Sequence, residues 1–216
     1  MFSVLDMFTI GVGPSSSHTV GPMCAAQAFA SSLEESGAVS RVGRIRVVLY
    51  GSLSLTGLGH GTDRAILAGL EGNVPATVDT DYLLSVRERC AHDGTIHVNG
   101  TNAIAYDDDG DMVFDRWKRL APHPNGMRFQ AFDAQGNIID EQVWYSIGGG
   151  FIRRGRIDDA LISNHEQTPA SSQSPEDSGN DEAAEYGDGV PYPFVSCDGL
   201  IDLCRNCLLY TSPSPR

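Results

Sequence analysis

Apolar and polar residues follow two different periods along the chain, which predicts both helices and strands. Residues 20–33 carry Ala, Met and Phe at helical spacing, and the Ser and Thr residues just before them are favourable helix N-caps. Residues 44–50 are β-branched and apolar, which is typical of a strand. Residues 53–69 have Leu, Ile and Ala at helical spacing, which predicts a second helix interrupted by glycines.

Strands dominate the sequence that follows. Residues 96–99 and 103–106 have the composition of strands, and the acidic run at 107–111 lacks the rest of a calcium-loop pattern, so we expect a solvated turn there. Residues 127–132 and 138–145 alternate in polarity around a polar turn, which predicts a hairpin with one buried face. Helices mixed with antiparallel hairpins predict an α+β fold, with packed helices on a mixed or antiparallel sheet.

The composition changes near residue 162, so we expect the folded domain to occupy residues 1–162. Residues 163–193 are rich in Ser, Glu, Asp, Gly and Pro, which is typical of an acidic disordered linker. Apolar sequence resumes in residues 194–207, which we expect to be the start of a second domain. Residues 208–216 contain prolines that cannot continue a helix. We therefore expect the chain to be a fragment with a non-native tail.

Charge and cysteine content limit the class of protein. The net charge of −13 over 216 residues repels phosphate and so argues against a nucleic-acid or anionic-membrane partner. No apolar run is long enough to span a bilayer, and the start does not read as a signal peptide. Five cysteines suit a reducing compartment better than a disulfide framework, so we expect a cytoplasmic protein. We expect Cys24 and Cys90 to be small buried residues, and no metal ligand on this chain.

The segment GVGPSSSHTVGPM, residues 11–23, is the most informative stretch for function. It places hydroxyls and an imidazole at a predicted helix N-terminus, where main-chain N–H groups and the helix dipole favour an anion such as a carboxylate. A helix start that is merely capped by serine would show the same pattern, and spacing alone favours that simpler interpretation.

Three further segments rich in glycine carry candidate chemistry. His60 lies between glycines that allow a ligand or another backbone to approach closely, although a flexible surface loop would look the same. His123 lies in the turn PHPNG, whose geometry explains its Pro, Asn and Gly but not the histidine. The segment YSIGGGF, residues 145–151, ends a strand in three glycines, which can form an anion-binding nest or can simply require positive φ angles.

These segments occur in the same order in the β domain of bacterial iron–sulfur L-serine dehydratases, which the chain resembles from residue 2 to residue 152. The resemblance rests on FSVLDMF, the serine-rich segment, GHGTD, HPNG and YSIGGGF. It implies the serine dehydratase β-domain fold, which is similar to the allosteric substrate-binding domain of some D-3-phosphoglycerate dehydrogenases.

The resemblance also implies an activity and its partners. The activity is the deamination of L-serine to pyruvate and ammonia. The implied cofactor is a [4Fe–4S] cluster whose ligands lie in an α domain, in the same chain or a separate one. Since that domain would follow this part of the protein, we expect the chain to be inactive alone. The family also makes a homodimer an expected partner arrangement.

Residue roles follow from the positions that match the family's segments. The resemblance implies His18, His60 and His123 as catalytic candidates, and we expect His18 or His60 to transfer a proton or hold the substrate, because imidazole titrates near neutral pH. The sequence does not choose between them. The positions expected to bind substrate are Ser15, Ser16, Ser17, Thr19, Thr62, Asp63, Asn125, Ser146, Gly148 and Gly149.

Two other functions compete with a lyase. A binding module for a small carboxylate or amino acid needs no proton-transfer residues, whereas this chain places histidines in three glycine-rich segments. A serine hydrolase that uses Ser16 and His60 is disfavoured, because the chain has no G-x-S-x-G elbow. The pair Cys204 and Cys207 is weak support for a metal site, since no second pair accompanies it.

Overall fold

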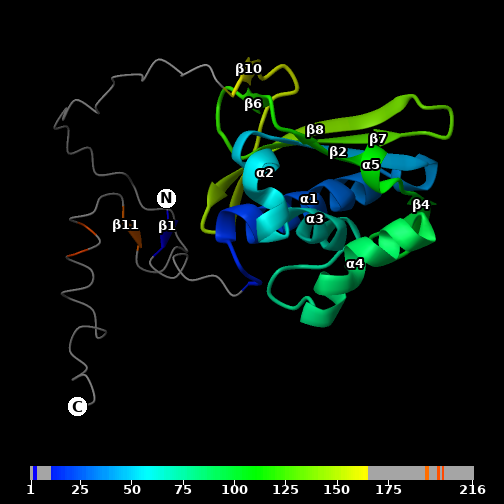
Figure 1. The fold of residues 1–216 in the computed structure, drawn as a ribbon, viewed down its shortest axis with the longest axis horizontal. Helices are drawn as coiled ribbons and strands as arrows, with labels where there is room; N and C mark the ends of the chain where they lie inside the picture. The colour runs from blue at the N-terminus through cyan, green and yellow to red at the C-terminus, as the bar shows by residue number, and fades with distance from the viewer. Residues whose placement is uncertain (1, 4–10, 165–192, 195–198, 200, 202–216) are drawn as a thin grey trace, which may run out of the picture. The chain divides into compact units, whose positions relative to one another are not determined.

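The computed structural model describes residues 2–3, 11–164, 193–194, 199 and 201 (Figure 1). The chain forms two compact units, one of Ile10–Ala170 and one of Met1–Thr9 with Ser171–Arg216. In the smaller unit, the short strand β1 (Phe2–Ser3) pairs antiparallel with β11 (Pro193–Phe194). Most of the expected linker and second-domain start, and all of the expected tail, lie outside the described residues, so those boundaries stay predictions.

A mixed seven-stranded sheet forms the centre of the larger unit (Figure 1). The strand order is β3-β4-β2-β7-β8-β9, and β5 also pairs with β2. Strand β2 runs antiparallel to β7 and parallel to β4 and β5. The expected α+β fold and the expected hairpin, formed by β7 and β8, are confirmed. The strands are β2 (Arg44–Tyr50), β3 (Thr95–Val98), β4 (Asn102–Ala105), β5 (Met112–Asp115), β7 (Gly126–Phe132), β8 (Ile138–Gly148) and β9 (Phe151–Arg154).

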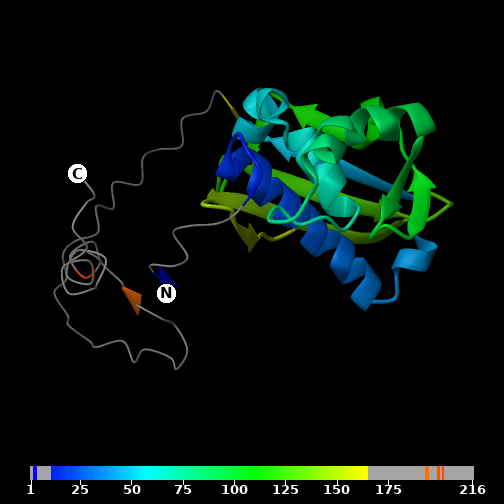
Figure 2. The ribbon, with the colours of Figure 1, turned by 90° about the horizontal axis from the view of Figure 1, so that it is seen from below.

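Three helices cover one face of this sheet, as Figure 2 shows. They are α1 (Gly21–Glu35), α3 (Thr62–Leu70) and α4 (Thr80–Asp93). Side chains alternate across β2, so Ile45, Val47 and Leu49 are buried against the helices. The main core joins the layers, with the rings of Phe29 in α1 and Phe129 in β7 stacked 5.2 Å apart. Among the described residues, no helix has the length and apolar character needed to cross a bilayer.

The opposite face of the sheet is covered at one end by a small antiparallel pair, β6 (Lys118–Leu120) and β10 (Leu161–Ser163). Leu120 of β6 packs there in a second apolar cluster with Tyr50 and Tyr145 of the sheet. This cluster holds the ends of β2 and β8 together, and the candidate site lies beside those ends. Strand β10 ends at Ser163, the first residue of the expected linker.

The helix expected over residues 53–69 is divided into three elements. These are α2 (Gly51–Thr56), the 3-10 helix η4 (Gly57–His60) and α3. Gly61 ends η4 with a φ of 65°, a left-handed conformation that glycine adopts without steric cost. The glycines therefore separate the helices completely, and the break places His60 at the end of a short turn.

Helix α4 was not predicted, because only Leu83, Val86 and Cys90 of its residues are buried. The signals of its two ends are nevertheless present in the sequence. The Asp79 side chain accepts a hydrogen bond from the main-chain N–H of Tyr82 at 2.8 Å, and a glycine with positive φ follows the last turn. The apolar spacing of α4 is too weak to predict the helix, whereas the capping residues at its two ends do indicate it.

The acidic run expected to be a solvated turn is instead a single helical turn, α5 (Asp108–Asp111). The expectation was wrong for Asp111, which is only 1% exposed and accepts a hydrogen bond of 2.5 Å from the Arg44 guanidinium. Burial raises the pKa of the Asp111 carboxyl, whereas its hydrogen bonds lower it. The run therefore fixes α5 against the start of β2.

Arg87 ties α4 to two other elements. Its guanidinium forms an ion pair with Asp63 of α3 and a second one, at 2.8 Å, with Asp108 of α5. Asp63 is only 3% exposed, so loss of Arg87 would leave a buried carboxylate without its ion-pair partner. Its two carboxylate partners raise the pKa of the Arg87 guanidinium still further above its already high ordinary value.

We expect Arg87→Met to lower the free energy of unfolding by about 3 kcal/mol, because it leaves the buried Asp63 carboxylate without its partner. Urea unfolding followed by circular dichroism at pH 7 measures this loss. Arg156→Met is the control, since Arg156 pairs with Asp158 at an exposed position and its loss should leave the unfolding midpoint unchanged. Equal midpoints for the two variants would contradict the structural role of Arg87.

Candidate active site

The four glycine-rich segments meet at one end of the central sheet. Strand β2 ends there, β7 begins there and β8 ends there, because Leu49 pairs with Met127 and Gly126 pairs with Tyr145. Hydrogen bonds and close packing join the segments across this end, and the contacts below build a single site from them.

The first segment forms a turn of π-helix, η2 (Ser16–Val20), that continues directly into α1. Ser15 caps this turn, since its hydroxyl accepts a hydrogen bond from the main-chain N–H of His18 at 3.2 Å. The expectation of a serine-capped helix start is therefore confirmed. Ser16 is exposed, whereas Ser17 and His18 are half-buried beside the second segment.

Two buried threonines tie the first segment to the second. The Thr19 hydroxyl donates to the main-chain carbonyl of His60 at 2.8 Å, and the Thr62 hydroxyl donates to the main-chain carbonyl of His18. Thr19 is 1% exposed and Thr62 is fully buried. Each threonine thus bonds to the main-chain carbonyl of the histidine in the other segment, and the two bonds hold the backbones of the first and second segments next to each other.

These two hydrogen bonds bring the imidazole rings of His18 and His60 next to each other. The ring centroids of His18 and His60 lie 4.9 Å apart, with an angle of 43° between the ring planes. His18 contacts a hydroxyl at each ring nitrogen, with Nδ1 2.8 Å from Ser17 Oγ and Nε2 3.0 Å from Ser52 Oγ. Both of its nitrogens are therefore engaged.

His60 has a different set of partners. Its Nδ1 lies 2.9 Å from the main-chain carbonyl oxygen of Thr56. A carbonyl can only accept a hydrogen bond, so Nδ1 carries the proton of the neutral ring. The lone pair of neutral His60 then lies on Nε2, which is the form that can act as a base.

The environment keeps two of the histidines neutral. Burial lowers the pKa of His18 below its ordinary value of 6.5, and the neighbouring His60 lowers it further, while a hydrogen bond with Ser52 acts in the opposite direction. Burial also lowers the pKa of His123, with a contribution from the positive charge of Arg153. Both imidazoles are therefore uncharged at neutral pH.

The third and fourth segments are joined by their main chains. Ser146 N–H donates to the Asn125 carbonyl at 3.0 Å, and the Asn125 side-chain amide donates back to the Ser146 carbonyl at 3.1 Å. Asn125 N–H donates to Nδ1 of His123 at 3.1 Å. This places the proton of neutral His123 on Nε2, where it can be donated.

Ser146, near the end of β8, packs against Gly21 at the start of α1. It is fully buried, and within the described part of the chain its hydroxyl has no hydrogen-bond partner. A Cβ atom added to Gly21 would lie 2.0 Å from this hydroxyl, so only glycine lets α1 approach β8 this closely. The fourth segment is thus packed directly on the helix that follows the first segment.

Gly148 is the last residue of β8, and Gly149 and Gly150 form the turn to β9. Gly148, Gly149 and Gly150 all have positive φ angles, of 97°, 62° and 84°. The expected conformational requirement for glycine is therefore confirmed, and anion binding by Gly148 and Gly149 stays a prediction. Asp63, in contrast, directs its carboxylate to Arg87 of α4 and not to the histidine pair.

Sequence analysis missed Ser52, which contacts His18 although 34 positions separate the two residues. A signal was present, because Gly51-Ser52 directly follows the predicted strand. Gly51 has a φ of 56°, and a Cβ atom on it would lie 2.2 Å from the carbonyl oxygen of Pro124. This glycine lets the end of β2 meet the third segment.

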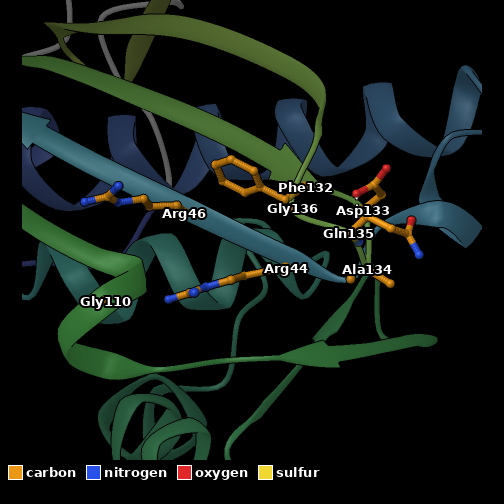
Figure 3. A pocket seen from close by; sticks show the side chains of 9 residues that line it. Arg44, Arg46, Gly110, Phe132, Asp133, Ala134, Gln135 and Gly136 are labelled. Atoms are coloured by element: carbon orange, nitrogen blue, oxygen red, sulfur yellow. Dashed lines mark hydrogen bonds between the residues drawn. The ribbon is translucent and has the colours of Figure 1, made fainter.

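A separate open hollow of about 660 Å³ lies at the other end of β2. Figure 3 shows Arg44 and Arg46 extending into it from β2, with the β7–β8 turn beside them. Arg44 is already paired with Asp111, and none of the predicted site residues lines this hollow. The histidine cluster, and not this hollow, is therefore the candidate active site.

The chain matches one family of known proteins and several individual relatives. A family described as "Serine dehydratase beta chain" matches residues 3–156. The chain is 49% identical over 203 residues to an L-serine dehydratase of Streptomyces coelicolor, covering 94% of this chain and 40% of that protein. It is 40% identical over 209 residues to L-serine dehydratase 1 of Escherichia coli, covering 95% and 40%. An L-serine dehydratase of Mycobacterium tuberculosis is 38% identical over 203 residues, with 94% and 39% covered. The chain thus spans about 40% of the length of these relatives.

The lowered pKa of His18 predicts a pH dependence of stability. The unfolded chain binds a proton at His18 near pH 6.5 while the folded chain does not, so stability is complete above that pH and falls as the pH drops towards the folded-state pKa. We expect His18→Gln to reduce the loss of stability between pH 7.5 and 5, measured as urea midpoints. His92→Gln, at an exposed position on α4, is the control. An unchanged pH profile in His18→Gln would contradict the burial of His18.

Proposed function

This chain belongs to the serine dehydratase beta chain family, and on that premise we propose that it forms the proton-transfer side of an active site that deaminates L-serine. The names of the relatives support serine as the substrate. The observation that carries the proposal is the pair of imidazoles held 4.9 Å apart by reciprocal threonine bonds.

The proposed reaction has two demands. A base removes the proton from Cα of serine, and the Cβ–O bond breaks with loss of hydroxide, which leaves aminoacrylate. Aminoacrylate becomes an imine and is hydrolysed to pyruvate and ammonia. The first demand needs a neutral imidazole or a similar base next to Cα.

His60 is our candidate for that base. Its Nδ1 proton is committed to the Thr56 carbonyl, so the lone pair on Nε2 can receive the α-proton. His18 meets a hydroxyl at both nitrogens, which suits a ring that holds a fixed position beside the base. We propose that His18 holds the ring of His60 in position and that His123 donates a hydrogen bond to the substrate through Nε2.

The remaining side chains suit the binding of a small carboxylate. The start of η2 combines serine hydroxyls with main-chain N–H groups that have no acceptor within their own helix. Asp63 is better explained as the partner of Arg87, which holds α4 to α3. The residues we propose to bind substrate are Ser15, Ser16, Ser17, Asn125, Gly148 and Gly149. We propose that the buried residues Thr19, Thr62 and Ser146 hold in place the segments that carry them.

Dependence on a [4Fe–4S] cluster is part of the proposal. Such a cluster would supply a Lewis acid for the departing hydroxyl. The described residues do not fit this group, because they contain no set of three or more His, Cys, Asp or Glu side chains able to hold a metal ion. Cys24 and Cys90 are free and lie on different helices. We propose that the cluster ligands belong to an α domain corresponding to the unmatched part of the relatives, and that the enzyme works in the reducing cytoplasm.

A chimera tests the proposed function. This chain would replace the stretch that it matches in the Streptomyces coelicolor relative, and pyruvate formation from L-serine would be measured anaerobically after cluster reconstitution. We expect activity, and we expect His60→Ala to reduce turnover at least 100-fold, since general base catalysis contributes about 10²–10⁴-fold. His92→Ala, exposed on α4, should leave turnover unchanged.

The outcomes separate the competing functions. Full activity of the His60→Ala chimera would remove His60 as the base. A folded and reconstituted chimera that binds L-serine but makes no pyruvate would contradict the lyase and favour a binding module.

A further inference from the structure

Helix α2 contacts both imidazoles of the candidate site, one near each of its ends. Ser52 near its start places Oγ 3.0 Å from Nε2 of His18, and Thr56 at its end accepts the Nδ1–H of His60 at 2.9 Å. We propose that Ser52 is a positioning residue that fixes the ring of His18, and that α2 thereby sets the arrangement of the histidine pair. The inference rests on the proposed function for its catalytic consequence only.

The main chain around Ser52 is held in place independently of the histidines. Ser52 N–H donates to the Pro124 carbonyl at 2.9 Å, and the φ of 56° at Gly51 permits this close approach. The Ser54 hydroxyl donates to the Gly51 carbonyl at 2.8 Å within the same turn. The Ser52 hydroxyl therefore projects from a backbone that is anchored to the third segment.

This hydroxyl completes a chain of hydrogen-bonding groups around His18. The chain runs through Ser15, whose hydroxyl accepts from the His18 main-chain N–H, to Ser17 Oγ at 3.4 Å and on to Nδ1. A neutral imidazole has one donor and one acceptor nitrogen, and a hydroxyl can serve either. Because Ser15 Oγ accepts from the His18 main-chain N–H, its own proton can go to Ser17 Oγ and the Ser17 proton to Nδ1 of His18. This arrangement favours the tautomer that carries its proton on Nε2 and donates it to Ser52 Oγ. Without Ser52, only the Ser17 side remains.

The orientation of His18 matters because its ring packs against that of His60. The 4.9 Å separation leaves no room for a side chain between the rings, so a rotation of His18 changes the surroundings of the proposed base. Ser52 would thus act on the reaction through His18, without touching the substrate. A role of this kind changes the state of the His18 ring, whereas a purely structural role does not.

Nuclear magnetic resonance on this chain tests the inference directly. Long-range ¹H–¹⁵N spectra report the tautomer of each histidine, and we expect the two His18 ring nitrogens to have clearly separated shifts. In Ser52→Ala the two shifts should move towards each other as the tautomers mix, and Ser52→Thr should restore the separation. Ser85→Ala is the control, because it removes an exposed serine hydroxyl that bonds only to main-chain carbonyls of its own helix, α4.

Unchanged His18 shifts in Ser52→Ala would overturn the inference, as would equal changes in Ser85→Ala. If Ser52→Ala fails to fold by circular dichroism, the nearly isosteric Ser52→Cys gives the same comparison. In the active chimera we expect Ser52→Ala to lower kcat about 10- to 100-fold, as for a misplaced catalytic group. An inactive chimera would count against the proposed function, whereas the spectra would still decide the role of Ser52.

Discussion

Two buried hydrogen bonds determine how this site is assembled. Thr19, which follows His18, donates to the carbonyl of His60. Thr62, two positions after His60, donates to the carbonyl of His18. Neither threonine hydroxyl has access to bulk water that could replace its partner, and an unpaired buried carbonyl is costly. The facing imidazoles, the contact of His18 with Ser52 and the proposed role of His60 all depend on this joint.

Local pattern was sufficient to identify the segments of the site but not their contacts. Clusters of Gly, Ser and His marked the positions of His18, His60 and His123, and the period of two marked the β7–β8 hairpin, which formed as expected. The contact of Ser52 with His18 was beyond such reasoning, because it depends on where β2 ends in the folded sheet. Asp63 shows the same limit, since its partner Arg87 lies on a helix that local apolar spacing did not reveal.

The arrangement connects the fold to the proposed chemistry. The sheet ends bring four loops together, the glycines at 21 and 51 allow close approach, and α2 holds the histidines from one side. Burial lowers the pKa of His18 and His123, which suits the proposed proton transfer and hydrogen bonding to a small amino acid.

The first and second segments form one candidate site in which the rings of His18 and His60 lie next to each other. The most direct measurement is the nuclear Overhauser effect between ring protons of His18 and His60 in the isotopically labelled chain. With ring centroids 4.9 Å apart, a cross-peak is predicted. The rings of Phe29 and Phe129, at 5.2 Å in the core, provide the internal reference. A clear Phe29–Phe129 signal without any His18–His60 signal would contradict the account.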